Sequence, residues 1–261
     1  LSTASYDSVS FSITSQDQNP RDLTFNSDGT KMYIMGNDTD SVYQYSLSTA
    51  FDLSTASYDS VSFSVSGQDT TVVSIAFNND GSKMYIVGTV TDSVYQYTLS
   101  TAFDLSTASY DSVSFSVSSE DSNPIGITFN DDGTKMYVVG FANDTIYQYS
   151  TSLTPQEVDL ATGNYFADTL AANTTYTLSN AGDVQSFQLE VTGGAVGYDL
   201  GAAVYDGVSF SVASQETAPN GLFFKPDGTK MYIVGTTGDD INQYSLSTAW
   251  DVSTASFDSV T

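Results

Sequence analysis

The chain has 261 residues, of which 40% are hydrophobic, and its 31 acidic and 6 basic residues give a formal charge of −25. This charge disfavours nucleic acid and anionic membranes as partners, because both attract Lys and Arg, and it favours a saline or extracellular setting. The absence of Cys excludes disulfides, and the absence of His excludes the Ser-His-Asp triad and the usual zinc sites. No apolar run approaches the ~18 residues that span a bilayer, so we expect no membrane insertion.

Residues 53–104 show the predicted elements of one unit in chain order. Residues 57–66 alternate apolar side chains with serine, which predicts a strand with one buried face. Residues 73–78 predict a second strand, and an Asn-Asp-Gly turn then leads into residues 83–88, an apolar strand that we expect to be central. Residues 93–99 predict the last strand. Four strands with short connections predict an antiparallel meander and no significant helix.

The same unit occurs four times. The pattern F-x-x-D-G-[TS]-K-M-Y, followed by [VI]-[YN]-Q-Y, recurs around Lys31, Lys83, Lys135 and Lys230. The first three lysines are 52 residues apart, and the last step is 95 residues. A four-stranded meander repeated at a fixed period predicts an all-β fold, a β-propeller of four-stranded antiparallel blades.

The long step contains residues 154–200, which echo parts of the unit but lack its V-Y-Q-Y strand. We interpret them as a degenerate fifth blade, which gives five blades in a single domain over residues 1–261. The alternative is four blades with a small β insertion. Residues 1–13 and 252–261 are copies of one segment and therefore compete for one outer-strand position. If the ring is closed, one of them completes the last blade beside strands from the other end of the chain.

Acidic residues recur in the loops of one predicted face. An outer and an inner ring of carboxylates would consist of Asp17, Asp69, Asp121 and Glu216, and of Asp40, Asp92, Asp144 and Asp240. Hard cations such as Ca²⁺ bind oxygen clusters of this kind, so these residues are a candidate metal site, and no other cofactor is expected. The alternative is that each Asp caps the backbone of its own turn. Arg21, the only arginine, lies among these acids, and we expect a salt bridge to Asp17 or Asp22.

The tyrosines of the Y-Q-Y strands are expected to fill the space between blades, although a stacking surface for sugars is an alternative. The unit F-N-x-D-G-T-K-M-Y-I-V-G…D-S-V-Y-Q-Y-S-L resembles the YVTN-type and gluconolactonase-like families of β-propeller repeats, and also a repeat from marine bacteria and their phages. Residues 157–180 resemble a sequence of phage fibres or other virion proteins. The resemblance implies the propeller fold. The lactonase families use a metal-binding set of Glu, Asn and Asp at unique positions, which does not map onto these repeated acids.

We therefore expect a non-catalytic propeller, not an enzyme, that serves binding or display on a virion appendage or cell surface. Its location would be extracellular or virion-associated. Its partners would be a cell-surface glycan or protein, such as a carbohydrate or host receptor, and other virion or surface-protein subunits. The alternative is a metal-dependent lactonase-like hydrolase with carboxylates at the mouth of its channel.

Overall fold

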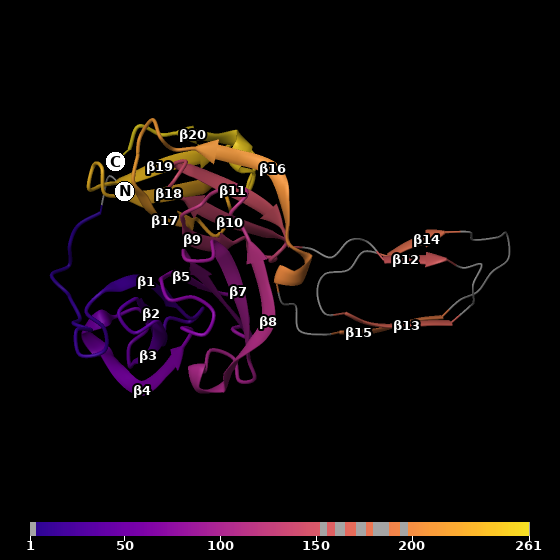
Figure 1. Cartoon of the computed structure of the whole chain (residues 1–261), viewed down its shortest axis with the longest axis horizontal. Coiled ribbons are helices and arrows are strands. Elements are labelled where there is room, and N and C mark those ends of the chain that lie inside the picture. The colour runs from indigo at the N-terminus through magenta and orange to yellow at the C-terminus, as the bar shows by residue number, and fades with distance from the viewer. Residues whose placement is uncertain are drawn as a thin grey trace.

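The computed structural model describes residues 4–151, 156–159, 165–170, 176–179, 188–193 and 198–260. Four antiparallel sheets of four strands each lie side by side around a centre (Figure 1), which confirms the predicted all-β propeller architecture. The helices among the described residues are 3-10 turns of three residues, so the expectation of no significant helix is also confirmed. No helix in this part of the chain is long and apolar enough to cross a membrane.

The strands of each blade lie in chain order from the centre outward. The first blade contains β1 (Pro20–Phe25), β2 (Lys31–Gly36), β3 (Ser41–Leu47) and β4 (Ala56–Ser64). The second contains β5 (Val72–Phe77), β6 (Lys83–Gly88), β7 (Ser93–Leu99) and β8 (Ala108–Ser116). The third contains β9 (Pro124–Phe129), β10 (Lys135–Gly140), β11 (Thr145–Ser150) and β16 (Val204–Ser211). The fourth contains β17 (Pro219–Phe224), β18 (Lys230–Gly235), β19 (Ile241–Leu246) and β20 (Ala255–Phe257). The 3-10 turns are η1 (Leu53–Thr55), η2 (Leu105–Thr107), η3 (Leu200–Ala202) and η4 (Val252–Thr254).

The sequence pattern of each strand matches its place in the blade. In β6, Met84, Tyr85, Ile86 and Val87 are fully buried, because both faces of this strand pack against neighbouring blades. The outer strand β8 alternates between half-buried and exposed positions, as its alternation with serine predicts. The prediction that the tyrosines of β3, β7 and β11 fill the space between blades is confirmed for Tyr97 and Tyr149, which are fully buried against Phe63 and Phe115 of the preceding blades. Tyr45 is fully buried as well, but it packs on Phe11 of the N-terminal segment.

The Asp-Gly turns connect the two inner strands of each blade. In the second blade, Asn78 Oδ1 accepts a hydrogen bond from Lys83 N at 2.9 Å, and Asp80 Oδ1 accepts one from Ser82 N at 2.9 Å. Gly81 has φ 72°, which only glycine adopts readily, and the ring of Phe103 lies against its Cα. The turn therefore requires glycine both for its backbone and for its packing.

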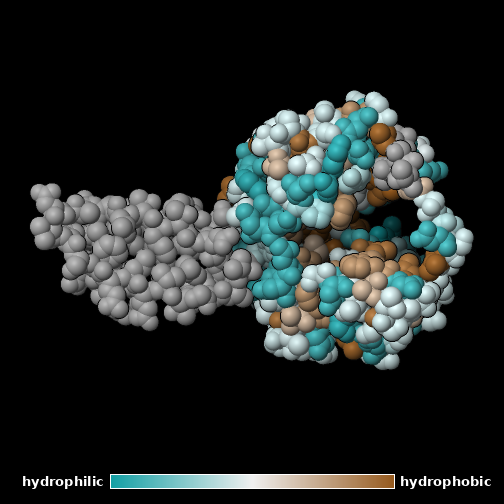
Figure 2. Space-filling view, turned by 180° about the vertical axis from the view of Figure 1, so that it is seen from behind, coloured by the Kyte–Doolittle hydropathy of each residue, from teal (hydrophilic) through white to brown (hydrophobic). Residues whose placement is uncertain are grey.

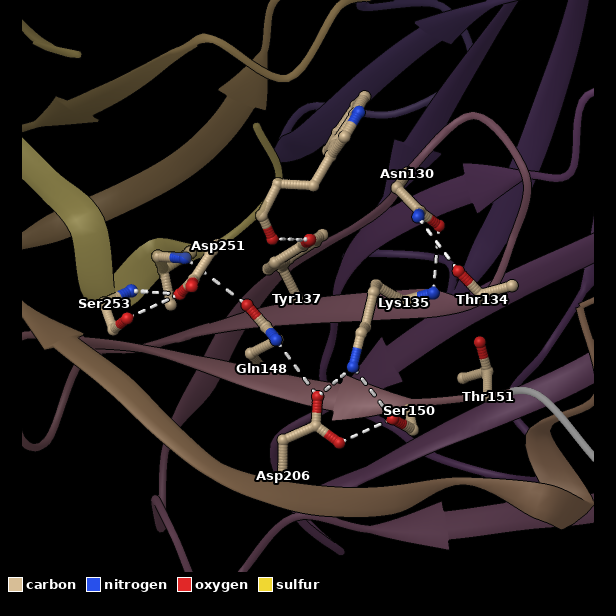
Figure 3. A network of polar contacts seen from close by, with 12 residues as sticks. Asn130, Thr134, Lys135, Tyr137, Gln148, Ser150, Thr151, Asp206, Asp251 and Ser253 are labelled. Atoms are coloured by element: carbon tan, nitrogen blue, oxygen red, sulfur yellow. Dashed lines mark hydrogen bonds and ion pairs between the residues drawn. The ribbon is translucent and has the colours of Figure 1, made fainter. Parts of the chain in front are cut away.

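A partly buried polar network joins the strands of each blade and links the first three blades to the next one, and Figure 3 shows it in the third blade. Lys135 Nζ forms an ion pair with Asp206 Oδ2 at 2.6 Å, and Gln148 Nε2 donates to the same oxygen at 3.1 Å. Gln148 Oε1 then accepts from Val252 N of the fourth blade at 3.3 Å. The repeated lysines and glutamines of the sequence are therefore structural: they bind an aspartate of the outer strand and connect neighbouring blades.

This network predicts a loss of stability in acid. Burial opposes ionisation of Asp258, but hydrogen bonds from Lys230, Ser245 and Gln243 outweigh it and lower the pKa of Asp258 to about 2. A carboxyl group with a lowered pKa stabilises the fold above its unfolded pKa of about 4, and this contribution disappears as the pH falls toward 2. We expect Asp258→Asn to destabilise the chain at pH 7 and to match the original protein at pH 2, as measured by urea unfolding at both pH values. A difference that did not change with pH would contradict this interpretation.

The pKa values of the equivalent carboxyl groups are lowered in the same way in the other blades. Burial again opposes the shift, and hydrogen bonds from the network outweigh it, at Asp59, Asp111 and Asp206. All four blades therefore contribute to the loss of stability in acid. The difference between the original protein and Asp258→Asn measures the contribution of the fourth blade alone.

The predicted fifth blade is not shown. The strands of the long step form two pairs, β12 (Gln156–Asp159) with β14 (Tyr176–Ser179), and β13 (Tyr165–Leu170) with β15 (Gln188–Gly193), and both pairs are parallel, unlike the antiparallel strands of a blade. The strand that follows them, β16, pairs with β11 and completes the third blade, just as β8 pairs with β7. The structure therefore shows four blades. Segment 154–200 lies partly outside the described residues, and its assignment as a β insertion stays a prediction.

The four blades form an open arc. Their innermost strands contact one another in the order β1, β5, β9, β17, and among the described residues no comparable contact joins β17 back to β1. Figure 2 shows the opening between the two ends of the arc. β20 takes the outer-strand position of the fourth blade, whereas the N-terminal copy, described from residue 4, forms no strand before β1. The ring closure that we considered is therefore not seen within this chain.

Candidate functional site

The predicted outer ring of carboxylates consists of buried side chains. Asp17, Asp69, Asp121 and Glu216 are at most 3% exposed. Asp69 shows their common role: Oδ1 accepts from Thr71 N at 2.8 Å, and Oδ2 accepts from Thr91 N at 3.1 Å and from Thr91 Oγ1 at 2.9 Å. This carboxylate therefore connects the loop before β5 to the loop after β6. Packing against Gly88 leaves no room for a Cβ there, which explains the glycine at the end of β6.

The predicted inner ring has strained backbones. Asp40, Asp92 and Asp144 have φ values of 47°, 48° and 47°, and each has one buried carboxylate oxygen without a hydrogen-bond partner in the described part of the chain. Burial, and then the charge of neighbouring carboxylates, raises the pKa of Asp40 and of Asp92. In the fourth blade it is Asp239, with φ 53°, that takes this position, and Asp240 follows it.

The two sets of acids do not converge on one point. Among the described residues, no group of three or more acidic side chains is close enough to hold a metal ion. The capping alternative accounts for the bond that Asp69 accepts from Thr71 N in its own turn, whereas the bonds from Thr91 come from another loop. Calcium binding by these eight residues stays a prediction.

Asp22 is a candidate that the repeat pattern concealed. It lies on β1, where the other three blades have Ser74, Gly126 and Gly221. Asp22 Oδ2 accepts from Ser74 Oγ at 2.6 Å and from Ile75 N at 2.9 Å, whereas Oδ1 accepts from Leu23 N at 2.8 Å. Burial raises the pKa of Asp22 above its ordinary value, although these three hydrogen bonds oppose the shift. Asp22 is thus the residue that breaks the repeat at this position of the innermost strands.

Asp22 lines a central cavity of about 260 Å³. Residues of all four innermost strands enclose this cavity, and most of them are apolar, including Ile75, Ile127 and Leu222. Asp22 is the only acidic side chain among its described lining residues. A central cavity with a single carboxylate of raised pKa is a candidate binding or catalytic site. We call it the axial pocket.

Arg21 lies beside Asp22 and lines a second hollow of about 410 Å³ along the inner strands of the first blade. The expected salt bridge to Asp17 or Asp22 is not formed: the ion pairs of the described residues involve lysines alone. The other blades have Val73, Ile125 and Asn220 at this position. Two adjacent departures from the repeat, Arg21 and Asp22, are the sequence signal that would have pointed to this site.

Solved structures with a similar fold were found for almost the whole chain. A candidate 6-phosphogluconolactonase from Bacteroides uniformis has a TM-score of 0.52 and 10% identity over 92% of this chain and 53% of its own. A protein from Lactobacillus plantarum has a TM-score of 0.51 and 12% identity, with coverages of 93% and 54%. A candidate 6-phosphogluconolactonase from Bacteroides fragilis has a TM-score of 0.50 and 12% identity, with coverages of 92% and 53%. No protein-family model and no curated protein matches the sequence.

Identities this low show the fold alone. The chain spans about half the length of these solved structures. The resemblance to propeller repeats is therefore supported at the level of the fold, and the resemblance to marine-bacterial and phage proteins stays a prediction. The chain shares the all-β propeller architecture of proteins that include candidate 6-phosphogluconolactonases.

Proposed function

We propose that this chain is a lactonase-like hydrolase that opens a cyclic ester in the axial pocket, with Asp22 as the general base. The observation that carries the proposal is the single carboxylate of raised pKa in a central pocket enclosed by all four innermost strands. The fold shared with candidate 6-phosphogluconolactonases supports the choice of lactones as substrates, as an analogy of fold. This is the alternative that the sequence offered beside binding or display.

The hydrogen bonds of Asp22 suit this role. Ser74 and Ile75 hold Oδ2, so Oδ1 is the oxygen on which a water molecule would be activated. Asp22 accepts one proton from this water while the water oxygen attacks the lactone carbonyl carbon. The bond between that carbon and the ring oxygen then breaks, and Asp22 returns the proton to the ring oxygen. Water and lactone thus give one hydroxy acid, and Asp22 is regenerated.

Two features limit the class of lactone that the pocket would accept and the role of a metal in the reaction. The charge of −25 and the carboxylate of Asp22 disfavour a phosphorylated substrate, so we expect an uncharged lactone. The lactonase resemblance also implies a metal held by Glu, Asn and Asp. Among the described residues no three acidic side chains lie close together, and the repeated acids do not map onto that set, so no step is derived through a metal.

The test is the hydrolysis of glucono-δ-lactone and of its 6-phosphate. Hydrolysis is measured as the release of acid, and the spontaneous rate is subtracted. We expect hydrolysis of the uncharged lactone and a roughly hundredfold lower kcat/KM in Asp22→Asn. The raised pKa also predicts that activity falls with decreasing pH above the range of an ordinary Asp, because the base must be ionised. Asp38→Asn, at an exposed acid outside the pocket, is the matched control and should leave the rate unchanged. Equal rates in both variants would refute the role of Asp22.

A non-catalytic role in binding or display is the second candidate. It is favoured by the near-identity of the blades, since the same buried acid and polar network recur in each. A surface of identical loops suits multivalent contact with a cell-surface glycan or protein, in an extracellular or virion-associated setting. Binding on a glycan array, together with no lactone hydrolysis above the spontaneous rate, would favour this candidate over the first.

A further inference from the structure

The three interfaces between neighbouring blades repeat one aromatic contact. A tyrosine of the second strand packs on a phenylalanine of the next blade, with ring centroids 4.6 Å apart in every case. The three pairs are Tyr33 with Phe77, Tyr85 with Phe129, and Tyr137 with Phe224. The near-identity of these pairs shows that one face of a blade is built to receive the opposite face of the following blade.

Two hydrogen bonds recur with this contact. The tyrosine hydroxyl donates to a backbone carbonyl of the next blade, in the pairs Tyr33 with Phe103, Tyr85 with Tyr198, and Tyr137 with Trp250. A glutamine Oε1 accepts from a backbone N–H at the next 3-10 turn, in the pairs Gln44 with Leu105, Gln96 with Leu200, and Gln148 with Val252. Each interface thus has one aromatic pair and two directional polar bonds.

Among the described residues, no strand or segment covers the receiving face of the fourth blade. Val234 and Ile241 are 43% and 41% exposed, whereas their equivalents in the second blade, Val87 and Val94, are fully buried. Phe223 is 61% exposed, and this face lines a hollow of about 590 Å³ together with Asp22 and Leu23 of β1. Tyr232 takes the place of the three interface tyrosines. We call this surface the fourth-blade face.

The first blade presents the complementary face at the other end of the arc. Leu23 is 52% exposed, whereas its equivalents Ile75 and Ile127 are 3% and 6% exposed. Phe51 is 59% exposed, and its ring packs on Phe25 at 5.4 Å, much as Phe103 packs on Phe77 at 5.6 Å. This first-blade face therefore holds the ring and the backbone groups that an interface tyrosine and glutamine meet elsewhere.

The N-terminal segment already covers the outer part of the first-blade face as an outer strand would. Phe11 packs on Tyr45 with centroids 5.6 Å apart at 84°, and Phe63 of β4 packs on Tyr97 of the next blade at 5.5 Å and 82°. The inner part, around Leu23, remains open as the hollow of about 410 Å³. The first-blade face is thus prepared for the inner strands of a preceding blade.

We propose that a second copy of this chain is the occupant, and that the fourth-blade face of each copy binds the first-blade face of the other. Tyr232 would then pack on the partner copy's Phe25 and donate to its Phe51 carbonyl, and Gln243 would accept from its Leu53 N–H. Two such contacts close a ring of eight blades, within the usual size of propellers.

The experiment measures molar mass by light scattering and sedimentation over a range of concentrations. We expect a dimer of the 27.8 kDa chain. Val234→Asp changes the fourth-blade face and Leu23→Asp changes the first-blade face, and each variant alone should be monomeric. Because the two faces differ, an equimolar mixture should regain dimers through the one intact pair of faces. A monomeric original chain, or a mixture that stays monomeric, would overturn the proposal.

Two controls keep the test decisive. Circular dichroism and thermal unfolding must show that both aspartate variants are folded. If either is not, Tyr232→Phe removes only the hydroxyl group at each of the two contacts and should raise the dimer dissociation constant roughly thirtyfold, while Tyr6→Phe, at a side chain that is 76% exposed, should not change it. Because both chains carry a charge of −25, added salt should strengthen the dimer, and a dimer weakened by salt would contradict an apolar interface.

Discussion

Gly81→Ala should lower the free energy of unfolding by about 3 kcal/mol, since two penalties add at this position. A Cβ on a residue with φ 72° meets its own backbone, which costs about 1 to 2 kcal/mol. The same Cβ would overlap the ring of Phe103, so the ring must leave its place against Phe77. For a chain of this size the melting temperature should fall by roughly 6 to 12 °C, which calorimetry measures.

Gly67→Ala is the matched control for this prediction. Gly67 has no positive φ, and nothing lies within 4 Å of the position of an added Cβ. Its replacement should change the free energy of unfolding by less than about 0.5 kcal/mol. If both variants lost similar stability, the packing of Phe103 on the turn would not be the reason for the conserved turn geometry in the four blades.

Tyr85→Ala should be more damaging, with a loss of about 4 kcal/mol. Tyr85 is fully buried, packs on Phe129 and Tyr198, and donates to the Tyr198 carbonyl. Its removal leaves a cavity at the interface between the second and third blades and a buried carbonyl without its donor. Urea unfolding at neutral pH measures the loss.

The comparison for Tyr85 is Tyr6→Ala, because Tyr6 is 76% exposed. We expect a change below about 0.5 kcal/mol there. A small effect at Tyr85 would show that the blades do not depend on this interface, and would also weaken the proposed pairing of Tyr232 with a second copy.

The strands could be predicted from the sequence because each has its own local signal. The alternation with serine in β8 and the apolar run of β6 follow from their one or two buried faces. The turn at Asn78–Gly81 could be predicted because its last residue has a positive φ, which favours glycine at that position. These signals are strong because they recur in four copies. A pattern that arose by chance in one copy would be absent from the other three.

The number of blades and the site could not be predicted in this way. The sequence of the long step resembles the repeat, but which strand completes the third blade depends on pairing between β11 and β16, which are far apart in the chain. The acids that recur drew attention to the loops, although Asp69 and its equivalents are buried structural groups. Asp22 occurs once, so a search for repeated residues passes over it.

The connection between the third and fourth strands of a blade has a consequence for how this fold can change. In the second blade it runs from Leu99 to Ala108, whereas in the third it runs from Ser150 to Val204, and the outer strand still pairs in the same way. The entropy of closing a loop rises only with the logarithm of its length, so the longer connection costs about 2 kcal/mol more. The added residues of the third blade precede Tyr198, which takes the place of Phe103 in the second blade. The segment between β7 and Phe103 is therefore a permissive site, where a foreign peptide or small domain could be grafted while the interface residues that follow it are kept.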